Sequence, residues 1–196
     1  NKSDVIGFIG LSGSGKTTLI NIILGLLQPQ KGELLYNELP LNNDTLNHWR
    51  SLVAYLPQDI FLVDDTLERN IALGIFDHEI DKVKVLEAIE KARLVDLVDS
   101  LPLGLQTIIG EKGIRVSGGQ KQRISLARAF YHGKEVLIMD ESTSALDTIT
   151  EQQIVEEINR LKGNKTIVVI AHRITTLQHC NAIYRLDKGN LSKKMT

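Results

Sequence analysis

The sequence contains little cysteine, few aromatic side chains and no long apolar run, and each shortage narrows the class of protein. One cysteine among 196 residues, Cys180, excludes an internal disulfide framework and allows a reducing compartment. Lysine and arginine total 23 against 24 acidic residues, so no basic excess indicates nucleic-acid binding. The apolar runs fall short of the roughly 20 residues that span a bilayer. The start of the chain lacks the basic segment and cleavage site of a signal peptide.

What the sequence does contain is enough apolar material for a buried core. Apolar residues make up 42% of the chain, too many for a disordered protein, and the length suits one domain with or without a subdomain. The chain opens without an initiating methionine, one step before a predicted strand. We therefore expect a fragment of a longer protein, itself soluble.

Short apolar strands alternate with helical patterns, which favours an α/β fold with a mainly parallel sheet. The runs EVLIM and TIVVIA are continuously apolar, as in parallel strands buried on both faces. The predicted strands are Asp4–Ile9, Gly32–Tyr36, Leu52–Leu56, Glu135–Met139, Thr166–Ala171, Ala182–Leu186 and Asn190–Lys193. The predicted helices are Lys16–Leu26, Leu94–Ser100, Ser117–Tyr131 and Gln152–Leu161. Residues 66–93 have a further helical pattern, with one apolar face at Val83, Leu86, Ile89 and Ala92.

The stretch GLSGSGKTT, residues 10–18, lies between the first predicted strand and the first predicted helix. It fits the pattern G-x-x-x-x-G-K-[ST] through Gly10, Gly15, Lys16 and Thr17. Glycines let a phosphate chain lie against bare backbone, where N–H groups and the positive end of a helix dipole bind the anion. Lys16 would reach the β- and γ-phosphates, and the Thr17 hydroxyl would ligate Mg²⁺. The alternative is a glycine-rich turn that binds nothing.

Two carboxylates, Asp140 and Glu141, follow the apolar strand VLIM at the edge where α/β sheets bind ligands. We expect Asp140 to hold Mg²⁺ through water. We expect Glu141 to polarise the water that attacks the γ-phosphorus in line. Two adjacent acids after a strand can also be a solvated turn, and the glycine loop is what favours the catalytic interpretation.

A second glycine-rich helix start, Ser117-Gly118-Gly119-Gln120, offers a second anion site by the same physics. A single ATP would not need both half-sites of one chain. This duplication is the feature that the residues alone leave unexplained.

Together these segments resemble the nucleotide-binding domain of an ATP-binding cassette (ABC) transporter. GLSGSGKTT resembles the Walker A loop and VLIMDE the Walker B strand with its catalytic glutamate. VSGGQ resembles the signature motif, with Val116 in place of the commoner leucine. Gln58 in YLPQD resembles the Q-loop glutamine, SALD (144–147) the D-loop, and His172 in IAHR the switch histidine. All six occur in the family order.

The resemblance implies a head-to-tail dimer, in which each ATP lies between the Walker A loop of one copy and the signature of the other. Two anion cradles on one chain suit two such symmetric sites. By resemblance, Glu141 and His172 are catalytic, and Thr17, Gln58 and Asp140 hold Mg²⁺. The ATP-binding residues would be Gly10, Ser12, Gly13, Ser14, Gly15, Lys16, Thr17, Thr18, Gln58, Ser117, Gly118, Gly119, Gln120 and Asp147.

The implied fold is a P-loop NTPase with a RecA-like core and an α-helical signature subdomain. Residues 1–58 and 133–196 would form the core, and residues 59–132 the helical subdomain. The expected function is ATP hydrolysis that drives a transmembrane domain, carried on the same full-length chain, at the cytoplasmic face of the inner membrane. A homodimer is expected, and no nucleic-acid partner.

Local details favour an exporter over an importer. DESTSALD lacks the proline that importer domains usually carry after the glutamate, and residues 107–113 resemble the TxVGExG segment of exporter domains. Glu111 is therefore a candidate for coupling to the membrane domain, the alternative being a solvated loop acid. YLPQDIFLVDDTLERNIALG resembles flippases for lipid-linked oligosaccharides and related lipid exporters. Within this stretch, Phe61 and Leu62 would either contact a helix of the membrane domain or lie in the core of the helical subdomain.

Two other functions compete with transport. A soluble cassette ATPase acting on DNA or ribosomes is one, but only 58 residues separate Gln58 from Ser117, too few for the long coiled coil of DNA-repair relatives. A regulatory pseudo-ATPase is the other, and the intact Glu141 and His172 argue against it.

One departure from the family concerns adenine. No aromatic residue precedes Gly10 except Phe8, which we expect to be buried in a strand. Since base stacking on an aromatic is worth roughly 1–3 kcal/mol, we expect ATP to bind about ten- to a hundredfold more weakly than to a domain that has this residue. Trp49 and Tyr55 are expected to be packing residues, and Cys180 a small buried apolar residue.

Overall fold

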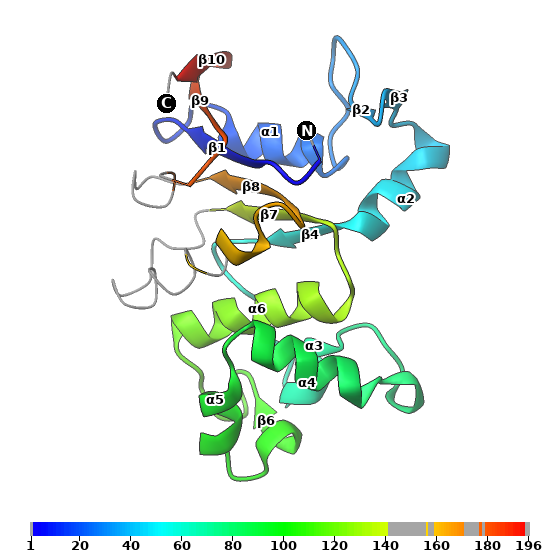
Figure 1. Ribbon diagram of the computed structural model, residues 1–196, viewed down its shortest axis with the longest axis vertical. Helices are drawn as coiled ribbons and strands as arrows, with labels where there is room; N and C mark the ends of the chain where they lie inside the picture. Colours follow the sequence, from blue (N-terminus) through cyan, green and yellow to red (C-terminus); the bar gives the residue numbers. More distant parts are fainter. Residues whose placement is uncertain (1, 141–155, 157–158, 171–176, 178, 195–196) are drawn as a thin grey trace. The chain divides into compact units, whose positions relative to one another are not determined.

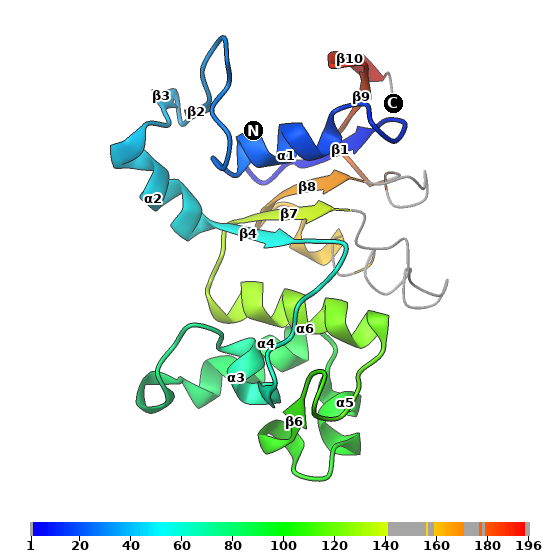
Figure 2. The ribbon, with the colours of Figure 1, turned by 180° about the vertical axis from the view of Figure 1, so that it is seen from behind.

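The computed structural model describes residues 2–140, 156, 159–170, 177 and 179–194 (Figures 1 and 2). Their contacts divide the chain into two compact units. The first lies within residues 1–57, 134–144 and 158–196, and the second within residues 58–133 and 145–157.

A six-stranded sheet in the order β10-β9-β1-β8-β7-β4 forms the first unit (Figure 1). Its strands are β1 (Val5–Ile9), β4 (Val53–Leu56), β7 (Val136–Asp140), β8 (Thr166–Ile170), β9 (Ala182–Asp187) and β10 (Asn190–Lys194). Neighbouring strands from β4 to β9 pair in parallel, and β10 runs antiparallel to β9. The mainly parallel sheet confirms the predicted fold class. It also places the carboxyl ends of β1, β4 and β7 at one edge.

Helices α1 (Lys16–Ile23) and α2 (Asn43–Leu52) pack on one face of this sheet. The buried residues that share this face are Phe8, Ile20, Leu24, Trp49, Val53, Val136, Ile138, Val168 and Ile170. Because side chains alternate along a strand, Leu137, Met139, Ile167 and Val169 belong to the opposite face, and they too are buried. The apolar runs of β7 and β8 are thus buried on both faces, as predicted.

Two elements near the start are shorter than predicted. Helix α1 ends at Ile23 instead of Leu26, because Gly25 takes a positive φ of 68° and turns the chain. Of the strand expected at 32–36, Leu35–Tyr36 forms β2, which pairs with β3 (Leu39–Pro40). Asn37 and Glu38 between them both have positive φ, which is the backbone of a tight two-residue hairpin.

The second unit is mainly helical. It contains α3 (Leu67–Ile71), α4 (Lys82–Lys91), α5 (Val95–Ser100) and α6 (Gly118–Tyr131), with short 3₁₀ turns at Asp77–Glu79 and Gly104–Gln106. Strands β5 (Asp65–Thr66) and β6 (Ile108–Ile109) form a small antiparallel pair. Helix α6 packs against α3 and α4, in the green and yellow-green part of Figure 2.

The buried face of α4 differs from the one that the sequence predicts. Val83 and Leu86 are 66% and 53% exposed, whereas Val85, Ala88 and Ile89 are buried. A strict spacing of three drifts around a helix of 3.6 residues per turn, so the four predicted positions cannot all stay on one face. The observed set follows the i, i+3, i+4 pattern of a single stripe.

Candidate nucleotide-binding site

The glycine loop follows the carboxyl end of β1 and leads into α1. Gly15 is the N-cap of α1 with a φ of 104°, a conformation that favours glycine. Gly10 is required for space, because a Cβ there would lie 2.5 Å from both the Leu186 oxygen and the Ser14 hydroxyl. The loop therefore has the bare, tightly turned backbone that a phosphate cradle needs.

The side chains of the loop fit an anionic ligand. Lys16 is 7% exposed, and its ammonium donates to the carbonyl oxygens of Gly10 at 2.9 Å and Leu11 at 3.0 Å. The Ser14 hydroxyl is buried and has no hydrogen-bond partner in the described part of the chain. An unsatisfied buried hydroxyl is costly, and a bound phosphate oxygen would satisfy it. Four other predicted contact residues, Ser12, Gly13, Thr17 and Thr18, are exposed.

The turn between β9 and β10 supports the loop. Gly189 donates its backbone N–H to the backbone oxygen of Ser14 at 3.2 Å, and the backbone oxygen of Leu186 lies against Gly10. These residues follow the loop by more than 170 positions, and no sequence pattern indicated the contact. The conformation of the glycine loop therefore depends on contacts with the distant turn between β9 and β10.

Asp140 ends β7 at the same sheet edge, and Tyr55 on β4 contacts it. The Tyr55 hydroxyl donates to Asp140 Oδ2 at 3.0 Å. Burial, followed by the negative charge of Asp140 and the hydrogen bond to it, raises the pKa of Tyr55 to about 12. The prediction of Tyr55 as a packing residue is wrong, since the side chain is 39% exposed and its hydroxyl forms a hydrogen bond with Asp140. Trp49 does pack, and its Nε1 donates to the Ile23 oxygen at 2.7 Å.

The residues of this edge fit a magnesium ion. Asp140 lies on the same sheet face as α1, because it follows Val136 and Ile138 in the alternation of β7. Thr17 is exposed in the first turn of that helix. Carboxylate and hydroxyl oxygens are hard ligands that suit Mg²⁺, which takes one or two protein ligands when it binds beside nucleotide phosphates. Within the described ranges, no three His, Cys, Asp or Glu residues gather as a metal site.

The predicted signature forms the N-terminus of α6. Ser117 is the N-cap, and its hydroxyl accepts from the Gln120 N–H at 3.3 Å while the Gln120 side chain accepts from the Ser117 N–H at 2.7 Å. This reciprocal capping box fixes the first turn of a helix of 14 residues. Gly118 is exposed and Gly119 is buried. Val116, the departure from the commoner leucine, is buried, so an apolar side chain is what this position needs.

Several predicted site residues lie outside the first unit or outside the described residues. Gln58 belongs to the second unit, where it is exposed. Glu141, Asp147 and His172 lie outside the described residues, and their roles stay predictions.

The second unit contains a cavity of about 530 Å³ beside the signature. Phe61, Glu111, Arg115 and Lys121 contribute to its lining. Phe61 is 73% exposed and Leu62 is 7% exposed. Leu62 therefore belongs to the core of the unit and Phe61 does not, although both line the cavity. Contact of Phe61 with a membrane-domain helix stays a prediction.

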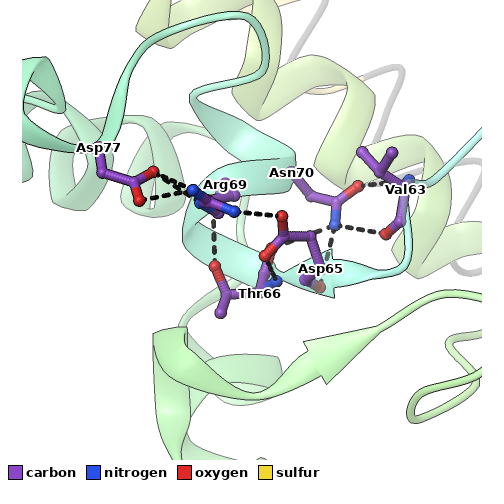
Figure 3. A network of polar contacts seen from close by, with 6 residues as sticks. All are labelled: Val63, Asp65, Thr66, Arg69, Asn70 and Asp77. Carbon is purple, nitrogen blue, oxygen red and sulfur yellow. Dashed lines mark hydrogen bonds and ion pairs between the residues drawn. The ribbon is translucent and has the colours of Figure 1, made fainter.

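A polar network holds the segment that leads away from this cavity (Figure 3). Asn70 is fully buried, and its side-chain nitrogen donates to the backbone oxygens of Val63, Asp65 and Thr66. Arg69 forms ion pairs with Asp65 at 2.7 Å and with Asp77 at 2.5 Å. The turn before α3 is therefore held by polar contacts.

The fold and the loop define a P-loop nucleotide-binding protein of the α/β class. The sequence model of the family described as ABC transporter matches residues 1–144. The chain therefore belongs to the ABC transporter family, and it is a nucleotide-binding (ATPase) domain of that family.

Known proteins resemble the chain over almost its full length. It is 41% identical to an ATP-dependent lipid A-core flippase of Bordetella avium over 95% of the chain and 31% of the flippase. A flippase of the same description from Cupriavidus metallidurans is 39% identical over 97% of the chain and 32% of the flippase. A bacterial Atm1-family ABC exporter solved with ATP bound is 33% identical, with a TM-score of 0.87 over 97% of the chain and 33% of the exporter.

The chain thus spans about a third of the length of these relatives. None of the helices in the described ranges has the length and apolar character needed to cross a bilayer.

Proposed function

We propose that the full-length protein is a membrane exporter, and that this domain hydrolyses ATP with Mg²⁺ to drive it. The observation that carries the proposal is the presence, on one ABC-family chain, of two glycine-rich helix N-termini, a feature that suits anion binding. One is the glycine loop before α1, with its orphaned Ser14 hydroxyl, and the other is the capped turn before α6. The chain would act at the cytoplasmic face of the inner membrane.

The two half-sites support a head-to-tail homodimer. Lys16 and the loop of one copy would bind the β- and γ-phosphates, while Ser117 and Gly118 of the other copy would close on the γ-phosphate. Each copy then supplies what the other needs, so the pairing is self-complementary and closes at two sites. ATP would join the two copies, and hydrolysis would separate them.

The cavity of the second unit supports contact with a membrane domain. It presents an exposed aromatic ring, Phe61, among charges of both signs from Glu111, Arg115 and Lys121. A short amphipathic segment of a transmembrane domain on the same chain would fit such a lining. Movement of the signature helix, which begins beside the cavity, would then reach the membrane.

The relatives supply the class of cargo. Two of them are described as lipid A-core flippases, so a lipid or lipid-linked glycan is the proposed substrate. These relatives also favour transport over action on DNA or ribosomes.

The test uses the full-length protein in nanodiscs. Glu141→Gln removes the proposed base but keeps the size of the side chain, so turnover should fall by at least about a hundredfold. Radiolabelled ATP should still bind and should remain bound during gel filtration, because the closed dimer cannot reopen.

The matched control is Glu135→Gln, which changes an acid just before the opposite end of the same strand, β7. It should leave turnover within twofold of the wild type. Full turnover by Glu141→Gln would remove the role of Glu141, and a wild type that neither binds nor hydrolyses ATP would overturn the proposed function.

A further inference from the structure

Tyr55 and Asp140 are diagonal neighbours on one face of the sheet. Strand β4 pairs with β7 so that Tyr55 lies opposite Ile138, and Asp140 lies two residues further along β7 on the same face. A diagonal pair of this kind is within reach of an aromatic side chain. Strand register therefore makes possible the 3.0 Å bond from the Tyr55 hydroxyl to Asp140 Oδ2.

The bond restricts the orientation of the Asp140 carboxylate. An aspartate at a strand end has two rotatable bonds, and Asp140 is only partly buried. A hydroxyl that donates to one carboxylate oxygen selects one orientation of the group. Outer-shell donors of this kind orient the ligands of metal sites.

We propose that Tyr55 is a positioning residue, whose hydroxyl orients the Asp140 carboxylate toward the Mg²⁺ that accompanies the nucleotide. This rests on the proposed function, since it requires Asp140 to serve the metal. The position is suited to the task, because Tyr55, Asp140 and the first turn of α1 share one edge and one face of the sheet. Tyr55 acts through Asp140 and contacts neither nucleotide nor metal.

The first experiment is Tyr55→Phe in the full-length protein, which removes the hydroxyl and keeps the ring. Mn²⁺ replaces Mg²⁺ as the probe, and its binding in the presence of a non-hydrolysable ATP analogue is followed by electron paramagnetic resonance. The apparent affinity for Mn²⁺ should fall about ten- to a hundredfold. Binding of the analogue in EDTA and the Tm without metal should not change, and both report that the domain is folded.

The matched control is Tyr36→Phe, which removes a tyrosine hydroxyl on β2, in the same unit but on a different strand pair. It should leave the affinity for Mn²⁺ within twofold of the wild type. Unchanged affinity in Tyr55→Phe, or an equal loss in both variants, would overturn the proposal.

A double-mutant cycle tests whether Tyr55 acts through Asp140. In an Asp140→Ala background, Tyr55→Phe should have no further effect on Mn²⁺ binding. An equal additional loss in that background would place the action of Tyr55 elsewhere and overturn the inference. If the wild type binds the analogue without any dependence on Mn²⁺, the metal role in the proposed function fails, and that result is separate from any effect of Tyr55.

Discussion

Arg128 in α6 holds Asn70 at both its backbone and its side chain. Its Nε donates to the Asn70 backbone oxygen at 2.7 Å, and a terminal nitrogen donates to the side-chain oxygen at 3.0 Å. The other terminal nitrogen donates to the backbone oxygen of Phe61 at 2.8 Å. One guanidinium therefore fastens both ends of the segment 61–70 to the helix that begins with the signature.

Asn70→Ala should destabilise the second unit by about 3 kcal/mol. The substitution removes the four hydrogen bonds between the Asn70 side chain and backbone groups. It also removes the side-chain oxygen that accepts from the partly buried Arg128 guanidinium. Each buried group left without a partner costs about 1–3 kcal/mol before the structure relaxes. Urea unfolding measures the loss. Asp77→Asn, which breaks a neighbouring ion pair on the surface, should cost less than about 1 kcal/mol. Equal effects of the two substitutions would show that burial of the network is unimportant.

Lys16→Ala should abolish ATP binding without unfolding the domain. The variant removes the ammonium proposed for the β- and γ-phosphates, together with two hydrogen bonds to loop carbonyls. Isothermal titration with ATP should show at least a hundredfold weaker binding, the combined effect of losing a charge-assisted contact and the order of the loop. Lys134→Ala, at the opposite end of β7, should bind as the wild type does. Binding by Lys16→Ala with undiminished affinity would exclude the loop as the phosphate site.

Gly118→Asp should spare the isolated half-site and block the composite one. A Cβ at Gly118 would meet no described atom within 4 Å, so the fold accommodates a side chain there. Its carboxylate would face the γ-phosphate bound to the other copy, and like charges would keep the dimer open. ATP binding should stay within threefold, while turnover of the full-length protein falls at least a hundredfold.

Gly118→Ala adds a side chain of little volume and no charge, and it should retain most of the turnover. If Gly118→Asp hydrolyses ATP at the wild-type rate, the signature does not face a phosphate.

Gly7→Ala should destabilise the first unit by about 1–3 kcal/mol. The added methyl carbon would lie 2.6 Å from Leu177 Cδ2 and 3.0 Å from the Cys180 sulfur, so two buried side chains would have to move. Thermal unfolding should show the loss, and a Tm equal to that of the wild type would contradict the close packing of β1.

Stability should fall as the pH rises above about 9. Burial raises the pKa of the Cys180 thiol from 9.0 to about 11, so between these values the unfolded chain releases a proton that the folded chain keeps. The unfolded state then binds fewer protons, and each pH unit in this window lowers the free energy of unfolding by up to about 1.4 kcal/mol. Urea unfolding from pH 8 to 10.5 measures the slope.

Cys180→Ala isolates the thiol from the other groups that titrate in this range. Its pH dependence should be flatter than that of the wild type. Parallel slopes in the two proteins would mean that Cys180 does not contribute.

The sequence predicted what depends on local pattern. The strand, glycine loop and helix from Val5 to Ile23 could be placed because the turn chemistry and the apolar periods lie in one short segment. The burial of Phe8 and Cys180 also follows from side-chain character and is confirmed. The helix at 117–131 was predicted within one residue of its observed bounds, because its N-cap signal is strong.

What the sequence could not supply depends on register and on distant contacts. Tyr55 reads as a packing residue, and its bond to Asp140 becomes visible only when β4 is set against β7. Val83 and Leu86 were predicted as core from a spacing of three that drifts around the helix, and the packing of α4 on α6 shows which stripe is buried. The hydrogen bond from the Gly189 N–H to the Ser14 backbone oxygen could not be predicted from the sequence, because backbone groups are the same whatever the side chain.

The position of β1 between β8 and β9 has a consequence during synthesis on the ribosome. Val5 is paired with Ile167 and Ile6 with Ala182, so β1 has neither of its neighbours until β8 and β9 have been made. An unfinished chain contains the glycine loop but lacks the neighbouring strands that hold it in shape. Strand pairing between residues far apart in the sequence also forms slowly. We therefore expect a nascent chain to bind ATP only after β8 and β9 have been made.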